Sequence, residues 1–157
     1  MEHELCVFLA TVAGEAGNCG MASWQAVACS IINRAEDTKR EWKRYKTVLE
    51  VISKTGYDAF THKNFAYRAA FEYFQNGVGN DNGLNMLRAV VEPIYTNRSI
   101  RPYPTTVLYY SPMALVALNI SDPKRHTRKK PNWNFGLLKP IFVPGAQQDD
   151  MAFFGYK

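Results

Sequence analysis

The stretch TVAGEAGNCGMASWQAVACSIINR, residues 11–34, joins two apolar segments through a glycine-rich turn. Apolar residues up to Val12, and again from Trp24, recur at the i, i+3, i+4, i+7 spacing of a helix with one buried face. The glycines and the asparagine between the two segments are typical of a helix end followed by a turn. The stretch therefore predicts an antiparallel pair of helices over residues 2–16 and 24–36.

Helical patterns continue through the first two thirds of the chain. Thr47 precedes the short apolar segment VLEVISK and is expected to cap its helix, which Gly56 ends. Two longer helical patterns follow in KNFAYRAAFEYFQNG and NGLNMLRAVVEPIY, separated by the turn-forming sequence NGVGNDNG. The charged stretch EDTKREWKRYK before Thr47 has only two aromatic anchors, Trp42 and Tyr45, and is expected to be a solvated connection.

The last third of the chain differs in composition. From RPYPTTVLYYSP onward, prolines, β-branched residues and tyrosines predict a short strand around residues 107–110. The tail LLKPIFVPGAQQDDMAFFGYK indicates two more short extended segments. Because the sequence has no internal repeat and no linker, we expect one mainly helical (α+β) domain over residues 1–157, with a few short strands in its C-terminal third.

The charge of the chain limits the classes of partner. Its 157 residues carry a formal net charge of +5, and the pI is near 9.1. Such a surface favours nucleic acid, membrane headgroups or the acidic polymers of a bacterial envelope, without choosing among them. No apolar run reaches the roughly 20 residues that a membrane helix needs. Insertion into a membrane is therefore not expected.

The cysteines and histidines do not predict a metal site. Cys6, Cys19 and Cys29 lack the spacing of metal ligands, and their odd number argues against a fully paired disulfide framework. We expect them to be small buried apolar side chains, with one disulfide among them as the alternative. The histidines show no partner spacing for zinc. We therefore expect no metal and no cofactor.

Glu15 is the residue of the opening stretch that suggests a chemical role. It lies seven residues after Phe8 and three after Val12, so it continues the apolar face of the first helix. A carboxylate there is partly desolvated, which raises its pKa, as a general acid near neutral pH requires. In the alternative, structural role, Glu15 pairs with an arginine such as Arg34 or accepts backbone hydrogen bonds at the turn. The spacing leaves both roles open.

Several segments along the chain share a pattern with a known family. Gly14-Glu15-Ala16 ends the first predicted helix, a glycine-rich turn follows, and Asn33-Arg34 ends the second helix. Further on come TVLEVISKTGYDAFT, VLYYSP, PNW and FFGYK, in that order. Together these elements resemble the bacterial cell wall hydrolase family typified by spore cortex-lytic enzymes. The sequence departs from the pattern near RPYPTTVLYY, where the family tends to carry an Asp-Pro and paired glycines.

The resemblance implies a lysozyme-like helical fold that cleaves peptidoglycan glycan strands. The bond cleaved would be the β-1,4 bond between N-acetylmuramic acid and N-acetylglucosamine, and Glu15 matches the essential acid of the family. A general acid protonates the leaving oxygen while an oxocarbenium-like transition state develops. Glu15 would then act as a base, toward the muramic acid 6-hydroxyl in a lytic transglycosylase or toward water in a muramidase. The sequence does not separate these two reactions.

A second carboxylate is the next candidate for the catalytic site. Many glycosidases use a second acid as nucleophile or base. Among the fourteen acids of the chain, Asp58 in KTGYDAFTH is the best placed, because it stands beside residues that match the cleft of the family. The alternative for Asp58 is structural, since aspartate near glycine and threonine commonly organises a turn.

Aromatic residues are the candidates for substrate binding. Their faces suit the apolar faces of sugar rings, and the predicted set is Tyr57, Phe60, Tyr110 and Trp133. For each of them, a place in the core is the alternative. Tyr109 precedes Tyr110 in a predicted strand, so the two side chains should face opposite ways and only one can line a given surface. We expect Tyr110 to line the cleft.

A basic segment supports the alternative function. The sequence KRHTRKK, residues 124–130, is either a solvated loop or a surface that attracts anionic wall polymers, a partner protein or nucleic acid phosphates. The alternative is a non-catalytic basic helical module that binds nucleic acid or peptidoglycan, with Glu15 in a structural role. Nucleic acid is the less favoured partner, because the resemblance implies peptidoglycan glycan strands.

The N-terminal sequence bears on where the protein acts. MEHELCVFLATVAGEAG carries acids where a secretory signal would carry Lys or Arg. We therefore expect synthesis in the cytoplasm without a signal peptide, and action in the periplasm or cell wall after delivery by a secretion system or during phage lysis. The expected protein is a monomer, either an antibacterial effector with a cognate immunity protein or a phage-type lysis enzyme.

Overall fold

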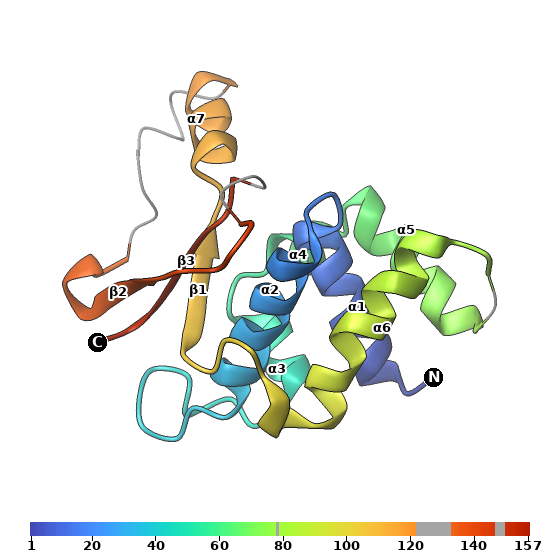
Figure 1. Cartoon of the computed structure of the whole chain (residues 1–157), viewed down its shortest axis with the longest axis horizontal. Helices are drawn as coiled ribbons and strands as arrows, with labels where there is room; N and C mark the ends of the chain where they lie inside the picture. The colour runs from blue at the N-terminus through green and yellow to red at the C-terminus, as the bar shows by residue number, and fades with distance from the viewer. Residues whose placement is uncertain (78, 122–132, 147–149) are drawn as a thin grey trace.

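The computed structural model describes residues 1–77, 79–121, 133–146 and 150–157. Helices from the first two thirds of the chain pack together, and a three-stranded antiparallel sheet from the last third stands beside them (Figure 1). The prediction of a mainly helical fold with a few short strands in its C-terminal third is confirmed.

Two parts of the molecule follow each other along the chain. The helical part contains α1 (His3–Ala16), α2 (Met21–Ala35), α3 (Val48–Lys54), α4 (Asp58–His62), α5 (Phe65–Asn76) and α6 (Asn82–Thr96). The sheet part contains η1 (Arg98–Ile100), β1 (Thr106–Tyr110), α7 (Pro112–Ser121), η2 (Phe135–Leu137), β2 (Leu138–Ile141) and β3 (Ala152–Tyr156). The sequence patterns predict most of these elements, but they do not predict α4 or α7.

α1 is the central helix of the helical part. It contacts α2, α3, α4, α5 and α6, and every residue from Leu5 to Ala13 is buried. The prediction of a single buried face is therefore wrong for α1, because neighbouring helices cover it on nearly all sides. Its one hydroxyl, on Thr11, donates to the carbonyl oxygen of Val7 at 2.7 Å and so keeps a partner despite its burial.

A tryptophan closes the turn between α1 and α2. Trp24, in the first turn of α2, donates its indole N–H to the carbonyl oxygen of Ala16 at 2.7 Å. Ala16 is the last residue of α1, where carbonyl groups lack helical partners. The bond therefore gives a buried carbonyl at the helix end its partner and constrains the turn of residues 17–20.

The start of α3 and the end of α5 have the capping residues that helix ends favour. The Thr47 hydroxyl accepts a bond from the N–H of Glu50 at 3.0 Å, and the Glu50 carboxylate accepts one from the N–H of Thr47 at 3.3 Å. The expectation that Thr47 caps α3 is confirmed, and the two bonds together form a capping box with Glu50. Gly77 ends α5 with a positive φ of 75°, a conformation that favours glycine.

The sheet has the strand order β1-β3-β2, and both pairs are antiparallel. β1 is therefore an edge strand, and it contacts α2. A register irregularity between Thr106 and Leu108 marks the start of β1. Nearby, a Cβ on Gly155 of β3 would stand 2.4 Å from the carbonyl oxygen of Thr105, so this close approach requires glycine.

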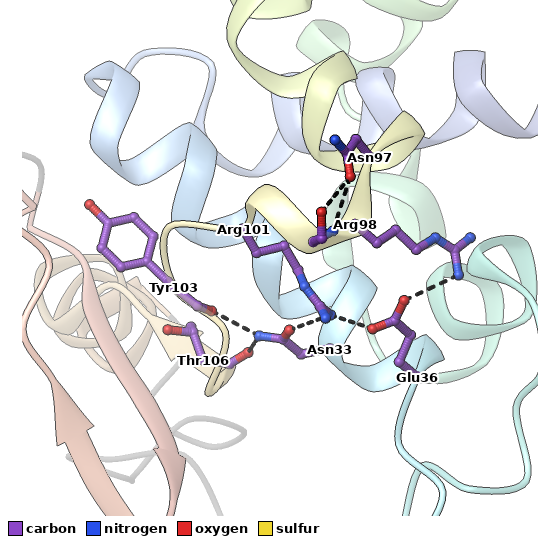
Figure 2. Close-up of polar contacts among 8 residues, drawn as sticks. Asn33, Glu36, Asn97, Arg98, Arg101, Tyr103 and Thr106 are labelled. Atoms are coloured by element: carbon purple, nitrogen blue, oxygen red, sulfur yellow. Dashed lines mark hydrogen bonds and ion pairs between the residues drawn. The ribbon is translucent and has the colours of Figure 1, made fainter.

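Two side chains at the end of α2 hold β1 against the helical part. Asn33 donates its side-chain N–H groups to the carbonyl oxygens of Tyr103 at 2.9 Å and Thr106 at 2.6 Å (Figure 2). Arg34 donates from Nε to the carbonyl oxygen of Val107 at 2.6 Å. Asn33 is only 8% exposed and Arg34 only 5%, so unpaired groups here would be costly. We call Asn33 and Arg34 the anchor of β1.

Among the described residues, none of the helices has both the length and the apolar character of a membrane-spanning segment. The three cysteines all lie in this described part and are free thiols. Cys6 and Cys29 are buried, as expected, whereas Cys19 is half-buried. The alternative of one disulfide among them is not observed.

The anchor predicts a large loss of stability for Asn33→Ala. The change removes two donors and leaves buried carbonyl oxygens without partners, at a cost of about 1–3 kcal/mol in the free energy of unfolding. Asn76→Ala is the control, because Asn76 is exposed at the end of α5, and its effect is expected to stay within about 0.5 kcal/mol. Urea unfolding measures both. Equal small effects would show that Asn33 does not anchor β1.

Candidate functional site

A groove of about 920 Å³ lies between the helical part and the sheet part. Its walls come from the ends of α1 and α2, the segments 40–42 and 55–58, β1, residues 133–138 and the end of β3. Five of the six residues predicted for the site line this groove: Glu15, Tyr57, Asp58, Tyr110 and Trp133. The sixth, Phe60, is not among the lining residues.

The carboxylate of Glu15 joins three elements within the groove. Glu15 is the penultimate residue of α1 and is half-buried. Its Oε1 accepts the backbone N–H of Ala59, in α4, at 2.7 Å, and its Oε2 accepts the hydroxyl of Tyr109, in β1, at 3.0 Å. The two donors fix the orientation of the carboxylate relative to the groove. Its partial burial agrees with the expectation of a partly desolvated carboxylate.

Burial raises the pKa of Glu15 above its ordinary value. The hydrogen bonds from Ala59 and Tyr109 act in the opposite direction, because both stabilise the charged form, and the nearby charge of Asp58 raises the pKa further. Arg34 lowers the pKa only weakly. The net direction is upward, so the carboxyl keeps its proton at a higher pH than a solvated glutamate does.

The guanidinium of Arg34 contacts groups other than Glu15. Its Nε donates to Val107 and its Nη1 to the hydroxyl of Thr55 at 2.9 Å, while the guanidinium lies over the rings of Trp42 at 4.6 Å and Tyr57 at 4.8 Å. No ion pair joins Arg34 to Glu15, both of which the structure describes. Of the two structural alternatives for Glu15, the arginine pair is thus absent and the backbone hydrogen bond, from Ala59, is present.

Tyr109 is the groove residue that sequence reasoning placed wrongly. Tyr109 and Tyr110 both line the groove, whereas only Tyr110 was expected there. Adjacent side chains of a strand face opposite ways, but β1 is at the edge of the sheet and both tyrosines contribute to the lining of the groove. Burial raises the pKa of Tyr109 well above its ordinary value, and the charge of Glu15 is the second largest cause. The hydroxyl of Tyr109 therefore stays a neutral donor.

Tyr110 and Trp133 form an aromatic wall of the groove. Their rings meet edge to face with centroids 5.7 Å apart, and Phe154 of β3 stacks on Tyr110 at 6.0 Å. Both residues are half-buried, so part of each ring faces the groove. Such a wall can pack against the apolar face of a sugar ring while the phenol and indole groups remain available as donors.

The other two aromatic candidates have structural positions. Tyr57 is 2% exposed and its hydroxyl lies 3.3 Å from Oγ of Ser30, so it supports the floor of the groove and offers little surface to a substrate. Phe60 packs edge to face against Tyr67 with centroids 5.9 Å apart. For Phe60 the geometry therefore agrees with the core alternative.

Asp58 is exposed at the first position of α4 and lines the groove near Glu15. A negative charge there is favourable at a helix start, which agrees with a structural role. Its effect on the pKa of Glu15 shows that the two charges interact. Both roles of Asp58 that the sequence allowed therefore remain compatible with its position.

The groove is also lined by residues that sequence reasoning missed. Glu41 and Trp42 come from the connection before α3, and Tyr156 comes from β3. The hydroxyl of Tyr156 donates to the carboxylate of Glu41, and the guanidinium of Arg40 lies 4.2 Å from the centre of the Tyr156 ring. Nothing in the sequence separates Glu41 from the other charges of its segment.

Some sequence expectations concern other regions of the chain. The basic segment 124–130 lies outside the described residues. Across the ranges that the structure describes, no three His, Cys, Asp or Glu side chains gather closely enough to hold a metal ion.

No family model, no curated protein and no solved structure matches the chain. The resemblance to cell wall hydrolases therefore stays a prediction from the sequence motifs. The observations that bear on function are the groove, the two hydrogen bonds to Glu15 and the aromatic wall.

The raised pKa of Glu15 predicts how its replacement changes stability with pH. The folded protein keeps this proton at a higher pH than the unfolded chain, whose carboxyl has an ordinary pKa near 4.5. The stabilising contribution is present below that value and lost as the pH rises through the folded-state pKa. Glu15→Gln cannot lose a proton, so the stability of this variant relative to wild type should rise as the pH increases from about 4.5 through the folded-state pKa of Glu15.

Urea unfolding across this pH range measures the difference, and Glu4→Gln is the control. Glu4 lies on the same helix and accepts bonds from the backbone N–H of Leu49 and the hydroxyl of Tyr95, but it does not line the groove. A relative stability of Glu15→Gln that stays flat or falls with pH would contradict a raised pKa.

Proposed function

We propose that the groove binds a glycan strand of peptidoglycan and that Glu15 cleaves the β-1,4 bond between N-acetylmuramic acid and N-acetylglucosamine. One observation carries the proposal: a half-buried carboxylate lines a large groove, burial raises its pKa, and two donors fix its orientation. These are the properties of a general acid that works near neutral pH. The sequence resemblance supports the same reaction.

The form of the groove supports a saccharide as the ligand. A volume of about 920 Å³ lies near the upper end of the range of about 300–1,000 Å³ that is typical of ligand sites. The aromatic wall of Tyr110 and Trp133 suits sugar rings, whose faces are apolar and whose edges carry hydroxyl groups. Tyr109 and Asp58 add polar groups near Glu15.

Glu15 acts first as an acid and then as a base. In its protonated form it donates the proton to the bridging oxygen as the bond from that oxygen to C1 breaks and positive charge develops at C1. The resulting carboxylate is stabilised by the N–H of Ala59 and the hydroxyl of Tyr109. It then accepts a proton from the incoming nucleophile, which forms the new bond to C1. The same two donors thus serve both halves of the reaction.

The nucleophile determines the product. Attack by the 6-hydroxyl of muramic acid leaves a 1,6-anhydro end, whereas attack by water leaves a reducing end. A single acid suffices for the first reaction, and a second carboxylate assists the second. Asp58 is the candidate for that second carboxylate, because it lines the groove beside Glu15. Mass spectrometry of the solubilised fragments separates the two outcomes.

The proposed substrate also determines where the protein acts. Peptidoglycan lies in the periplasm or cell wall, so a chain made in the cytoplasm acts after delivery by a secretion system or during lysis by a phage. In the effector case, a cognate immunity protein would protect the producing cell.

Glu15→Gln is expected to lose about 10²- to 10⁴-fold in the rate of sacculus solubilisation, the size of a general acid contribution. The side chain keeps its shape, but the amide has no acidic proton to donate. The measurement is the fall in turbidity of purified sacculi. Glu4→Gln is the control on the same helix and is expected to clear sacculi at about the wild-type rate, because Glu4 does not line the groove.

Two results would contradict the catalytic role. Clearing by Glu15→Gln at the wild-type rate would remove Glu15 from the chemistry. Binding of sacculi by the wild-type protein without any clearing would favour the non-catalytic alternative, a module that only binds peptidoglycan.

Tyr109→Phe tests how the pKa of Glu15 is controlled. The hydroxyl of Tyr109 stabilises the charged carboxylate, so its removal should raise the pKa of Glu15 further. The decline of activity on the alkaline side, where the general acid loses its proton, should therefore move to higher pH, although the maximal rate falls. A pH profile of sacculus clearing measures this. An unchanged or acid-shifted decline would contradict the assigned bond.

A further inference from the structure

A second pocket of about 470 Å³ adjoins the groove. The two share Arg40, Tyr156 and Lys157 as lining residues, so they lie next to each other at the end of β3. On β2, Leu138 lines the groove and Lys139 lines the second pocket. The shared residues mark the place where a side branch of a ligand in the groove would enter the second pocket.

One wall of the second pocket is held by a polar network (Figure 2). Arg101 donates from Nη1 to Oδ1 of Asn33 at 2.9 Å and pairs with Glu36 at 2.6 Å. Arg98 approaches the other oxygen of Glu36 at 3.6 Å. The same Asn33 anchors β1, so this wall and the position of the sheet depend on one side chain.

The two carboxylates of the second pocket already have partners. Glu36 is paired with arginines, and Asp37 accepts the backbone N–H groups of Lys39 and Arg40 at 3.0 Å and of Trp42 at 3.3 Å. These bonds neutralise Glu36 and hold Asp37 in the turn. The acids are therefore part of the wall, and they are not free to bind a cationic ligand.

Three cations of the second pocket have no such partner. Arg40, Lys139 and Lys157 are exposed, and none of them forms an ion pair within the described ranges of the chain. Arg40 is held in place by its contact with the ring of Tyr156, which leaves its N–H groups available. The pocket thus presents unpaired positive side chains beside carboxylates that already have partners, which favours a compact anionic group.

We propose that this second pocket binds carboxylate groups of the peptide stem that branches from the glycan strand. The inference rests on the proposed function, because it places the strand itself in the groove. The lactyl group of muramic acid carries the stem, so a strand in the groove projects its stem sideways. Arg40 at the junction, with Lys139 and Lys157 around the recess, then pairs with the carboxylates. The groove thus binds the sugars, and the second pocket binds the peptide stem.

A nucleic acid fits this geometry less well. Binding to its backbone uses many cations placed along an open surface, each neutralising one phosphate. Here three free cations surround a recess whose wall contains two carboxylates, Glu36 and Asp37. A short branch with one or two carboxylates matches three cations around a recess, whereas a long polyanion requires a row of cations along an open surface.

The test is a binding titration with the full-length Glu15→Gln protein, which prevents turnover. The probes are the GlcNAc-MurNAc disaccharide bearing its stem peptide, the same disaccharide without the peptide, the free stem peptide and a short single-stranded DNA. Calorimetry measures each affinity, with and without the additional substitution Lys139→Gln. Lys54→Gln is the matched control, because Lys54 is an exposed lysine that lines neither the groove nor the second pocket.

The expected result is tighter binding of the peptide-bearing disaccharide than of the bare one. Lys139→Gln should weaken that tighter binding about two- to fivefold, the size of a solvent-exposed charge pair, and Lys54→Gln should leave it unchanged. Since Lys139 is exposed on β2, its substitution should not alter the fold, which an unfolding curve verifies.

The outcomes separate this inference from the proposed function. Equal affinity for the two disaccharides, or equal effects of Lys139→Gln and Lys54→Gln, would overturn the stem subsite and leave the groove proposal standing. Lys139-dependent binding of the free peptide without binding of the bare disaccharide would support the subsite and contradict the saccharide groove. Binding of the DNA alone, weakened by Lys139→Gln, would overturn the subsite in favour of nucleic acid.

Discussion

The position of the sheet depends on the hydrogen bonds from Asn33 and Arg34, at the end of α2, to backbone carbonyl groups at the start of β1. Buried carbonyl oxygens require donors, and the last turn of α2 supplies them from two consecutive side chains. This constraint sets the register in which β1 passes the helical part. In that register Tyr109 meets the carboxylate of Glu15, and the space between α1 and β1 becomes the groove. The site is therefore a consequence of how the two parts are joined.

Two glutamates on α1 show which feature distinguishes a candidate acid. Glu4 and Glu15 each accept one backbone N–H and one tyrosine hydroxyl, Glu4 from Leu49 and Tyr95 and Glu15 from its partners in α4 and β1. Hydrogen bonding of this kind thus occurs at both ends of the central helix and does not by itself indicate catalysis. Only Glu15 also lines the groove, where its protonation can affect a ligand. The chemical proposal follows from that access, together with the effect of burial on the pKa.

Local signals in the sequence predicted most of the helices, the cap at Thr47 and the partial burial of Glu15, because each depends on residues within one or two turns. The Thr47 cap, for example, involves only the four residues from Thr47 to Glu50. Tyr109 could not be chosen over Tyr110 in this way, since the choice depends on which faces of an edge strand the groove reaches. Glu41 and the cations of the second pocket were missed for a similar reason: segments distant in sequence bring them together only in the folded chain.

The central claim is that Glu15 delivers a proton to a glycosidic oxygen held in the groove. The most direct measurement is a crystal structure of the Glu15→Gln protein with a bound peptidoglycan glycan fragment. The account predicts sugar rings along Tyr110 and Trp133, with a bridging oxygen within hydrogen-bonding distance of the side chain at position 15. A fragment bound elsewhere on the surface, or one in the groove whose bridging oxygens all lie beyond the reach of that side chain, would contradict it.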